Sequence, residues 1–309
     1  MIRIEGLTKR FSSTLAVDNL TLDIDQGTVF GFLGPNGAGK TTTIRMLCSL
    51  ISPTEGKAYI KDLDTTNQTE SLKIRRMIGL LPEAPGLYDS LSAYRNLDFY
   101  ARLYGLSPKE REDNIEKYLK ILGVWERRNE PVGNYSKGMR QKIAIARALV
   151  HDPLVLFLDE PTSGLDPESA KTVRDFIHNL KEENRTIFLN THNLDEAERI
   201  CDKIGIIKTR LIAVGSPQEL SSKMGNRKVA IHLVKIDEGL MSAVRGIDFV
   251  KNVEHVKNTL ICDVDNPEDE NPVIIETIVK AGGKVQFVTD MKHSLEDVYL
   301  ELVKEAAPK

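Results

Sequence analysis

The sequence has few cysteines, no long apolar run and little net charge. Its three cysteines, Cys48, Cys201 and Cys262, are widely spaced and form no CxxC pair, which indicates reduced thiols in a cytosolic protein. No apolar run approaches the roughly 18 residues needed to cross a bilayer, and the opening Met1–Glu5 lacks a signal-peptide core. A formal net charge of −3 gives no sign of steering toward nucleic acid. If the protein works at a membrane, we therefore expect another chain to span it.

The longer, N-terminal part of the chain predicts alternating strands and helices. Val29–Leu33 is apolar and leads through a glycine-rich turn into an apolar-periodic helix near Thr41–Leu50. Leu154–Leu158 is continuously apolar, as expected for a strand buried on both faces, and Thr186–Asn190 and Ile204–Ile207 share this character. Strands separated by helices indicate an α/β fold with a mostly parallel sheet covered on both sides.

The pattern changes near residue 218, where a polar stretch containing glycine predicts a boundary. We expect a large domain at 1–218, a linker at 219–227 and a small accessory domain at 228–309, an organisation that 309 residues with 41% hydrophobic side chains can support. The strands and helices expected in the small domain follow the order of a ferredoxin-like α+β unit. Within it, the acidic Asp265–Asn271 segment is interpreted as a solvated loop, with the next helix starting at about Asn271.

Residues Gly34–Thr41 match the phosphate-loop pattern G-x-x-x-x-G-K-[ST] between an expected strand and an expected helix. The glycines let backbone N–H groups close around phosphates, Lys40 reaches the β- and γ-phosphates, and the Thr41 hydroxyl ligates Mg²⁺. A glycine turn with a surface lysine is the alternative, and the correct context at both ends speaks against it. The residues expected at the phosphates are Asn36, Gly37, Ala38, Gly39, Lys40, Thr41 and Thr42.

Two carboxylates follow the buried strand Leu154–Leu158. A strand that ends in this way directs Asp159 toward the Mg²⁺ shell and Glu160 toward the attacking water. Acids at a strand end can also serve solvation alone, but their pairing with the phosphate loop favours catalysis. Together the two motifs indicate a P-loop NTPase.

Further segments resemble a known family. Tyr135–Gln141, with the sequence YSKGMRQ, resembles the signature of ABC transporter cassettes, which is usually written LSGGQ. Asp159–Pro167 resembles the Walker B motif and D-loop of that family, and Asn190–His192 follows a strand as the family's switch histidine does. The motifs occur in the family's order. The resemblance implies an ABC cassette with a mostly parallel core sheet, an antiparallel β-subdomain and a helical subdomain at about 84–150.

The resemblance also implies that two ATP molecules bind between two head-to-tail cassettes. Ser136 and Gly138 would then contact the γ-phosphate of the nucleotide held by the other cassette, and Asp166 would bridge the two cassettes. Taken alone, Ser136 is more simply a helix cap, Gly138 a turn, and Asp166 a cap before Pro167. The second cassette is expected to be an identical copy or a paralogue.

Catalytic roles are implied for Lys40, Glu160 and His192. Glu160 would act as a base or position the water, His192 would contact the γ-phosphate, and Lys40 with Mg²⁺ would neutralise developing charge. Phe11 and Val17 are expected beside the adenine, although an aromatic residue after a strand is commonly part of the core.

The sequence departs from the family pattern at three positions. Lys137 replaces the usual glycine of the signature, while the flanking serine and glycine remain. Glu83 stands where the family has glutamine, and a carboxylate can still approach Mg²⁺ or its water. The expected metal-binding residues are therefore Thr41, Glu83 and Asp159. Arg95 replaces a glutamate near the groove for the membrane partner, which bears on partner choice rather than on hydrolysis.

These features indicate the ATP-hydrolysing subunit of an ABC transporter, located in the cytoplasm and peripheral at the inner face of the cell membrane. The expected partner is a separate multi-span membrane subunit that docks on the helical segment Ala84–Gly105, and no nucleic acid is expected. The closing Ser294–Leu300 segment resembles cassettes of the drug-, lipid- and ion-exporter branch, which favours export.

A soluble ABC ATPase that acts on ribosomes or DNA is the main alternative. Ribosome-acting members usually carry two cassettes in one chain, whereas this sequence has one phosphate loop. DNA-acting members usually separate the phosphate loop from the signature by long coiled coils, whereas here only the Ala84–Asn134 region intervenes. A small-molecule kinase or GTPase would not need the signature, and the sequence has no NKxD guanine motif.

Overall fold

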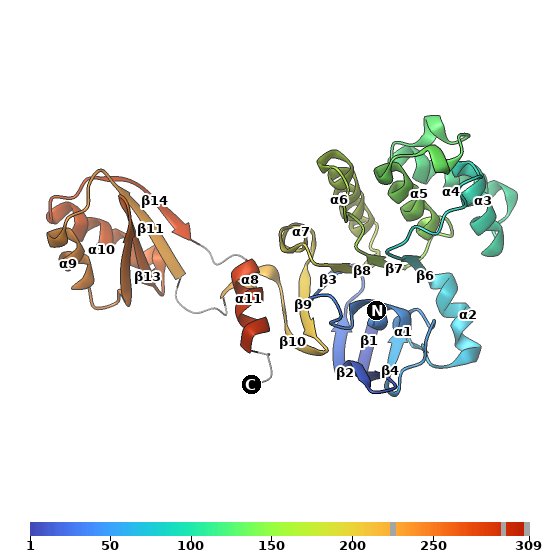
Figure 1. The fold of residues 1–309 in the computed structure, drawn as a ribbon, viewed down its shortest axis with the longest axis horizontal. Helices are drawn as coiled ribbons and strands as arrows, with labels where there is room; N and C mark the ends of the chain where they lie inside the picture. Colours follow the sequence, from blue (N-terminus) through green and yellow to red (C-terminus); the bar gives the residue numbers. More distant parts are fainter. Residues whose placement is uncertain (223–226, 292–294, 306–309) are drawn as a thin grey trace. The chain divides into compact units, whose positions relative to one another are not determined.

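A computed structural model describes residues 1–222, 227–291 and 295–305 of the chain, which form two compact units (Figure 1). The N-terminal unit comprises Met1–Pro217 and the C-terminal unit comprises Gln218–Glu305. Part of the expected linker, residues 223–226, and Ser294 of the closing segment lie outside the described residues. Within the described ranges, no helix has the length and apolar character needed to cross a membrane.

The larger sheet of the N-terminal unit has the strand order β10-β9-β3-β8-β7-β6. Its strands are β3 (Val29–Leu33), β6 (Ile78–Leu81), β7 (Val155–Asp159), β8 (Thr186–Thr191), β9 (Lys203–Lys208) and β10 (Arg210–Gly215). Neighbouring strands are parallel except for the edge pair β9 and β10. Every residue of β3, β7 and β8 is buried, and rings from these three strands pack together at the centre of the core. The expected mostly parallel sheet is confirmed.

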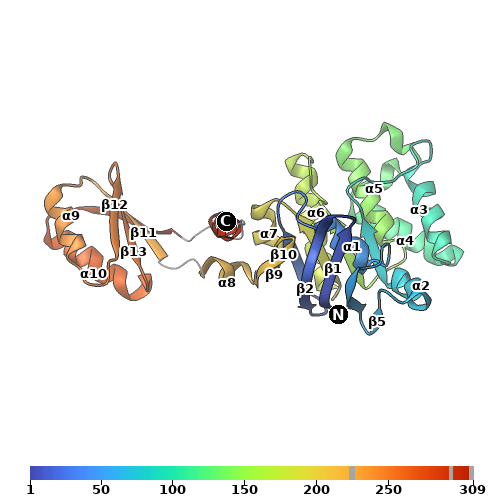
Figure 2. The ribbon, with the colours of Figure 1, turned by 60° about the horizontal axis from the view of Figure 1, so that its bottom comes forward.

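The smaller sheet of this unit is antiparallel and has the order β2-β1-β4-β5. It is formed by β1 (Ile2–Phe11), β2 (Thr14–Ile24), β4 (Glu55–Ile60) and β5 (Leu63–Asp64). Helix α1 (Lys40–Leu47) contacts β2 and β4, and Figure 2 shows it beside this sheet. Its buried side chains join a hydrophobic core shared by both sheets.

Helices surround the larger sheet. They are α2 (Gln68–Met77), α3 (Ala93–Leu103), α4 (Pro108–Ile121), α5 (Lys137–Leu149), α6 (Pro167–Glu182) and α7 (Leu194–Ile200), with short 3₁₀ turns at Trp125–Arg127 and Val132–Asn134. Helices α3, α4 and α5 contact one another and gather into one group (Figure 1). Helix α4 begins at Pro108 with a capping box between Ser107 and Glu110, which satisfies two backbone N–H groups at the helix start.

Helix α8 (Pro217–Ser222) begins at the last residue of the N-terminal unit. The C-terminal unit continues with β11 (Arg227–Leu233), α9 (Glu238–Arg245), β12 (Asn252–Val256), β13 (Thr259–Val264), α10 (Pro267–Lys280), β14 (Val285–Met291) and α11 (Leu295–Glu305). The sheet order β12-β13-β11-β14, with antiparallel neighbours, is that of a ferredoxin-like unit. Helices α9 and α10 pack on one face of this sheet around a separate hydrophobic core (Figure 2). The expected ferredoxin-like order is confirmed.

The expectation of an acidic loop at Asp265–Asn271 was wrong, because α10 begins at Pro267 rather than near Asn271. Proline is favoured at the first helical position, where its missing N–H has no partner to lose. The acidic side chains of the first turn are favoured by the positive end of the helix dipole. In addition, the Glu270 carboxylate accepts hydrogen bonds from the backbone N–H groups of Asp265 and Asn266.

We predict that a chain ending at Ser222 folds and binds ATP with the affinity of the full chain. The reason is that the core around β3, β7 and β8 is built within residues 2–214, whereas the second core starts at Val229. Thermal unfolding followed by circular dichroism and titration with a fluorescent ATP analogue check this. A truncated chain that unfolds cooperatively but has lost nucleotide binding would contradict it.

Candidate active site

The glycine-rich turn between β3 and α1 needs glycine for steric reasons. Gly37 and Gly39 have φ angles of 81° and 100°, in the left-handed region that side chains disfavour. A Cβ atom built on Gly39 would also collide with the Ala16 carbonyl oxygen. None of the described side chains caps the start of α1, so its first backbone N–H groups are available to an anion.

Lys40 is the first residue of α1, and only 7% of it is exposed. Its Nζ donates hydrogen bonds to the carbonyl oxygens of Gly34 (2.6 Å) and Pro35 (3.1 Å) within the turn. Burial lowers the pKa of Lys40, and the negative charges of Glu160 and Asp159 oppose this shift. A cation held by two carbonyl oxygens is suited to exchange these partners for phosphate oxygens.

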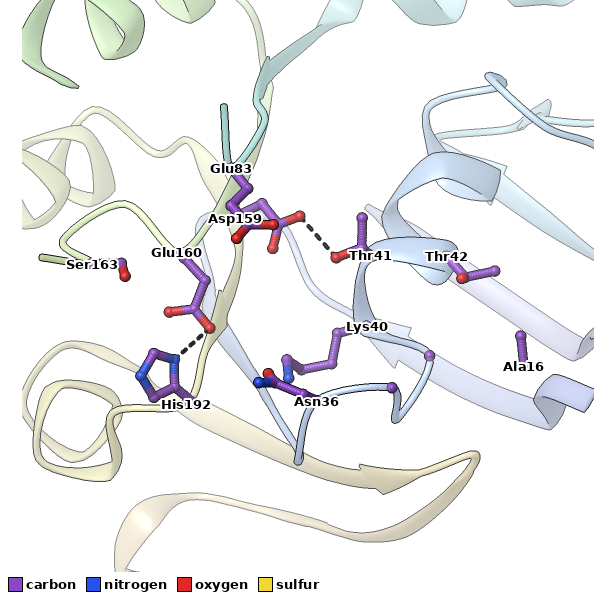
Figure 3. A pocket seen from close by; sticks show the side chains of 12 residues that line it. Ala16, Asn36, Lys40, Thr41, Thr42, Glu83, Asp159, Glu160, Ser163 and His192 are labelled. Carbon is purple, nitrogen blue, oxygen red and sulfur yellow. Dashed lines mark hydrogen bonds and ion pairs between the residues drawn. The ribbon is translucent and has the colours of Figure 1, made fainter. Parts of the chain in front are cut away.

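Asp159 ends β7 and faces Thr41 across the cavity (Figure 3). Its Oδ2 accepts a hydrogen bond from the Thr41 hydroxyl at 3.0 Å, and its Oδ1 accepts one from Asn190 Nδ2 at 3.1 Å. Glu83 lines the same cavity, so the side chains expected to bind the metal all offer oxygen atoms. The described residues hold no cluster of three or more His, Cys, Asp or Glu side chains that could bind a metal unaided. This set still fits Mg²⁺, which usually keeps several waters and binds one or two carboxylates plus substrate phosphates.

Glu160 and His192 form a contact pair at the other side of the cavity (Figure 3). His192 Nδ1 lies 2.8 Å from Glu160 Oε1 and donates to it when that nitrogen is protonated. The backbone of Glu160 has a φ angle of 53°, and its N–H donates to the Asn190 carbonyl at 3.0 Å. A left-handed conformation at a non-glycine residue is a strained feature that is enriched at functional sites.

These side chains line one cavity of about 280 Å³. Its lining residues are Ala16, Asn36, Gly37, Gly39, Lys40, Thr41, Thr42, Glu83, Asp159, Glu160, Ser163 and His192. Ala38 and Val17, both expected at the nucleotide, are buried in the core and do not line it. Phe11 lies at the end of β1, is 47% exposed, and has the Lys9 ammonium 5.0 Å from its ring centroid.

The structure does not bring Ser136, Gly138 and Asp166 into this cavity. Ser136 caps α5 by accepting from Met139 N–H at 3.2 Å, and Asp166 caps α6 by accepting from Ser169 N–H at 2.9 Å. Gly138 packs against Ser169, leaving no room for a side chain. The starts of α5 and α6 are therefore adjacent. Within one chain, Ser136 and Asp166 both act as helix caps.

Three residues at the site were not predicted as contributors. Ala16 and Ser163 line the cavity, and Asn190 holds Asp159 from β8. Asn190 was noted only as a neighbour of the switch histidine. A polar residue at the end of an otherwise apolar strand is the signal that marks it.

The ABC transporter family matches residues 17–163, and the C-terminal domain described as ATP-binding protein DrrA1-3-like matches residues 215–303. The bacitracin transport ATP-binding protein BcrA of Bacillus licheniformis is 36% identical over 304 residues, which cover 98% of this chain and 97% of that protein. The daunorubicin/doxorubicin resistance ATP-binding protein DrrA of Streptomyces peucetius is 33% identical over 99% of this chain and 93% of its own length.

A solved structure is similar to this chain in fold. The ATP-binding cassette MJ0796, in a dimeric post-hydrolysis state with ADP and Pi, matches with a TM-score of 0.64 and 27% identity over 70% of this chain and 98% of its own. The expected cassette fold is confirmed. The relatives are named for transport or drug resistance, so they do not favour the alternative of an ATPase that acts on ribosomes or DNA.

We predict that Lys40→Ala weakens ATP binding about 10- to 100-fold, because a hydrogen bond to a charged group contributes about 1.5–3 kcal/mol. Titration with a fluorescent ATP analogue measures the change. Lys171→Ala, at an exposed position of α6, removes the same charge away from the cavity and should leave the affinity unchanged. Equal affinities for the two variants would contradict the assignment of Lys40 to the phosphates.

Proposed function

Because this chain belongs to the ABC transporter ATP-binding family, we propose that it drives export through a separate membrane subunit by ATP-dependent pairing of two cassettes. The chain is an ATPase and the ATP-binding subunit of a transporter. The observation that carries the proposal is the meeting of Lys40, Asp159, Glu160 and His192 around one cavity. Export is supported by relatives named for daunorubicin/doxorubicin resistance and for fluoroquinolone export.

The phosphates of ATP bind in the glycine-rich turn. The N–H groups at the start of α1 and the Lys40 ammonium donate to the phosphate oxygens, and Thr42 lines the cavity beside them. Thr41 and Asp159 would hold Mg²⁺, and Glu83, which lines the same cavity, would offer a further carboxylate to the ion. When bound, the ion neutralises charge on the phosphates.

Hydrolysis uses Glu160 and His192. A water oxygen attacks the γ-phosphorus, the bond to the oxygen shared with the β-phosphate breaks, and the Glu160 carboxylate takes up a proton of the water. The products are ADP and inorganic phosphate. His192 lies 2.8 Å from Glu160, so the two side chains can hold the water from one side while Lys40 stabilises charge from the other.

A second cassette completes the site. Ser136 and Gly138 lie at the amino end of α5, where backbone N–H groups and a hydroxyl suit a γ-phosphate, yet they lie outside the cavity of their own chain. A second copy or a paralogue placed head to tail supplies these groups in trans, with Asp166 between the two chains. The dimeric form of the MJ0796 cassette supports this arrangement.

An apolar hollow between α2 and α3 receives the membrane subunit. The hollow has a volume of about 500 Å³, and its lining includes Leu72 and Leu103, each 68% exposed, with Arg75 and Arg76 beside them. Exposed leucines around a hollow are typical of a protein–protein contact. An amphipathic helix with an acidic residue fits this surface. Docking there would hold the chain at the inner face of the membrane.

We predict that Glu160→Gln keeps ATP binding, nearly abolishes turnover and traps an ATP-dependent dimer. The amide keeps the shape of the side chain but cannot take up the proton. Size-exclusion chromatography with light scattering, with and without ATP, measures the dimer, and a phosphate-release assay measures turnover. Glu112→Gln, at an exposed position of α4, is the matched control. An ATP-loaded monomer in the Glu160→Gln protein would count against the paired cassettes.

We also predict that Leu72→Glu and Leu103→Glu reduce recovery of a multi-span membrane protein. Tagged Glu160→Gln protein carrying either change is pulled from gently solubilised native membranes with ATP and analysed by mass spectrometry. Val279→Glu, at an exposed position of α10, is the control and should keep the partner. If both leucine variants recover as much membrane protein as the parent, the hollow is not the docking site. Ribosomal or DNA-associated proteins in place of a membrane protein would favour the alternative function.

A further inference from the structure

Glu196 of α7 is a buried carboxylate close to the active site that the hydrolysis mechanism does not use. Only 3% of it is exposed. Its Oε2 accepts a hydrogen bond from the Thr162 hydroxyl at 2.7 Å and a longer one from the Thr191 hydroxyl at 3.3 Å. Burial raises the pKa of Glu196, and the two hydroxyl groups oppose that shift.

The two threonines lie on the segments that carry the reacting pair. Thr162 follows Glu160 by two residues, and Thr191 directly precedes His192. The Glu196 carboxylate therefore joins the loop after β7 to the end of β8. These are the segments whose spacing determines the 2.8 Å contact between Glu160 and His192.

The loop that leads to Glu196 is held by its own hydrogen bonds. The Thr191 hydroxyl accepts from the Asn193 N–H at 3.0 Å, and the Asn193 side chain caps α7 by accepting from the Glu196 N–H at 3.0 Å. Because Asn193 already caps the helix, the Glu196 side chain is not needed for that purpose. Its position is instead determined by the two hydroxyl groups.

If Glu196 had only a structural role, an uncharged side chain would serve it with a smaller desolvation cost. Burying a carboxylate is unfavourable unless hydrogen bonds compensate for its lost hydration. Glu196 Oε1 is buried and has no hydrogen-bond partner among the described residues, so the compensation is incomplete. A buried polar atom left without a partner in a folded protein calls for an explanation, and proximity to a catalytic pair supplies one.

We propose that Glu196 is a positioning residue that sets the contact between Glu160 and His192 by holding Thr162 and Thr191 together. The inference rests on the roles proposed above for Glu160 and His192. Glu196 itself does not line the cavity. It acts on turnover through the geometry of the pair and leaves the phosphate loop unchanged.

Steady-state kinetics of three variants give the first test. Glu196→Ala should lower kcat about 10- to 100-fold, the effect of misplacing a catalytic group by about 1 Å. The KM for ATP should stay near that of the parent, because Lys40 and the glycine-rich turn are unaffected. Glu196→Gln keeps an oxygen acceptor and should retain most of the rate. Thr162→Val, which removes one hydroxyl at nearly constant volume, should fall between them.

A double-mutant comparison separates positioning from general destabilisation. In a His192→Ala background the contact is absent, so Glu196→Ala should cause little further loss in single-turnover hydrolysis. The same fold-loss in both backgrounds would overturn the proposal, as would a parental kcat for both Glu196→Ala and Thr162→Val. Thermal unfolding identifies any variant that fails to fold. If Glu196→Ala does not fold, the kcat of Thr162→Val tests the proposal.

The same assays distinguish failure of the inference from failure of the proposed mechanism. If Glu160→Gln and His192→Ala leave the rate unchanged, the catalytic roles themselves are refuted. If those two variants lose activity while Glu196→Ala and Thr162→Val do not, only the positioning role is refuted.

Discussion

The common direction of β3, β7 and β8 is the constraint on which the site depends. The carboxyl ends of parallel strands meet at one edge of a sheet, where ligands of open α/β folds bind. The registers pair Leu33 with Thr191 and Asp159 with Asn190, so the three strands end at the same level. Phosphate loop, acidic pair and histidine are therefore brought together by hydrophobic burial of the sheet, although they are far apart in the chain.

Features that depend on local spacing could be predicted from the sequence. The turn before Lys40 and the acids after β7 are such features, because a strand end or a helix start determines where each side chain points. Glu196 could not be found in this way, since its role depends on Thr162 approaching from another loop. The start of α10 was misplaced because the acidic residues of Asp265–Asn271 were interpreted as a solvated loop, whereas most of them lie in the first turn of the helix after Pro267. The hydrogen bonds from Asp265 and Asn266 to the Glu270 carboxylate at this helix start could not be foreseen from composition.

The lysine in the signature is accommodated by the neighbouring loop. Gly164 has a φ angle of 65°, and a Cβ atom built on it would collide with the Lys137 ammonium. The Lys137 ammonium therefore lies directly against Gly164, where no side chain stands in its way. Ser136 and Gly138 keep their places at the start of α5, so the substitution adds a positive charge beside the loop without altering the cap.

Helix α5 connects the signature segment to the loops that follow Glu160 and Glu83. Near its start, Gln141 Nε2 donates to the Pro161 carbonyl at 2.9 Å, directly after Glu160. Near its end, Arg147 donates to the Pro85 carbonyl at 2.7 Å, two residues after Glu83. A helix is stiff along its axis because every turn is hydrogen-bonded to the next. In the proposed pairing of two cassettes, a contact at Ser136 would therefore be linked through one helix to the segments that follow Glu160 and Glu83.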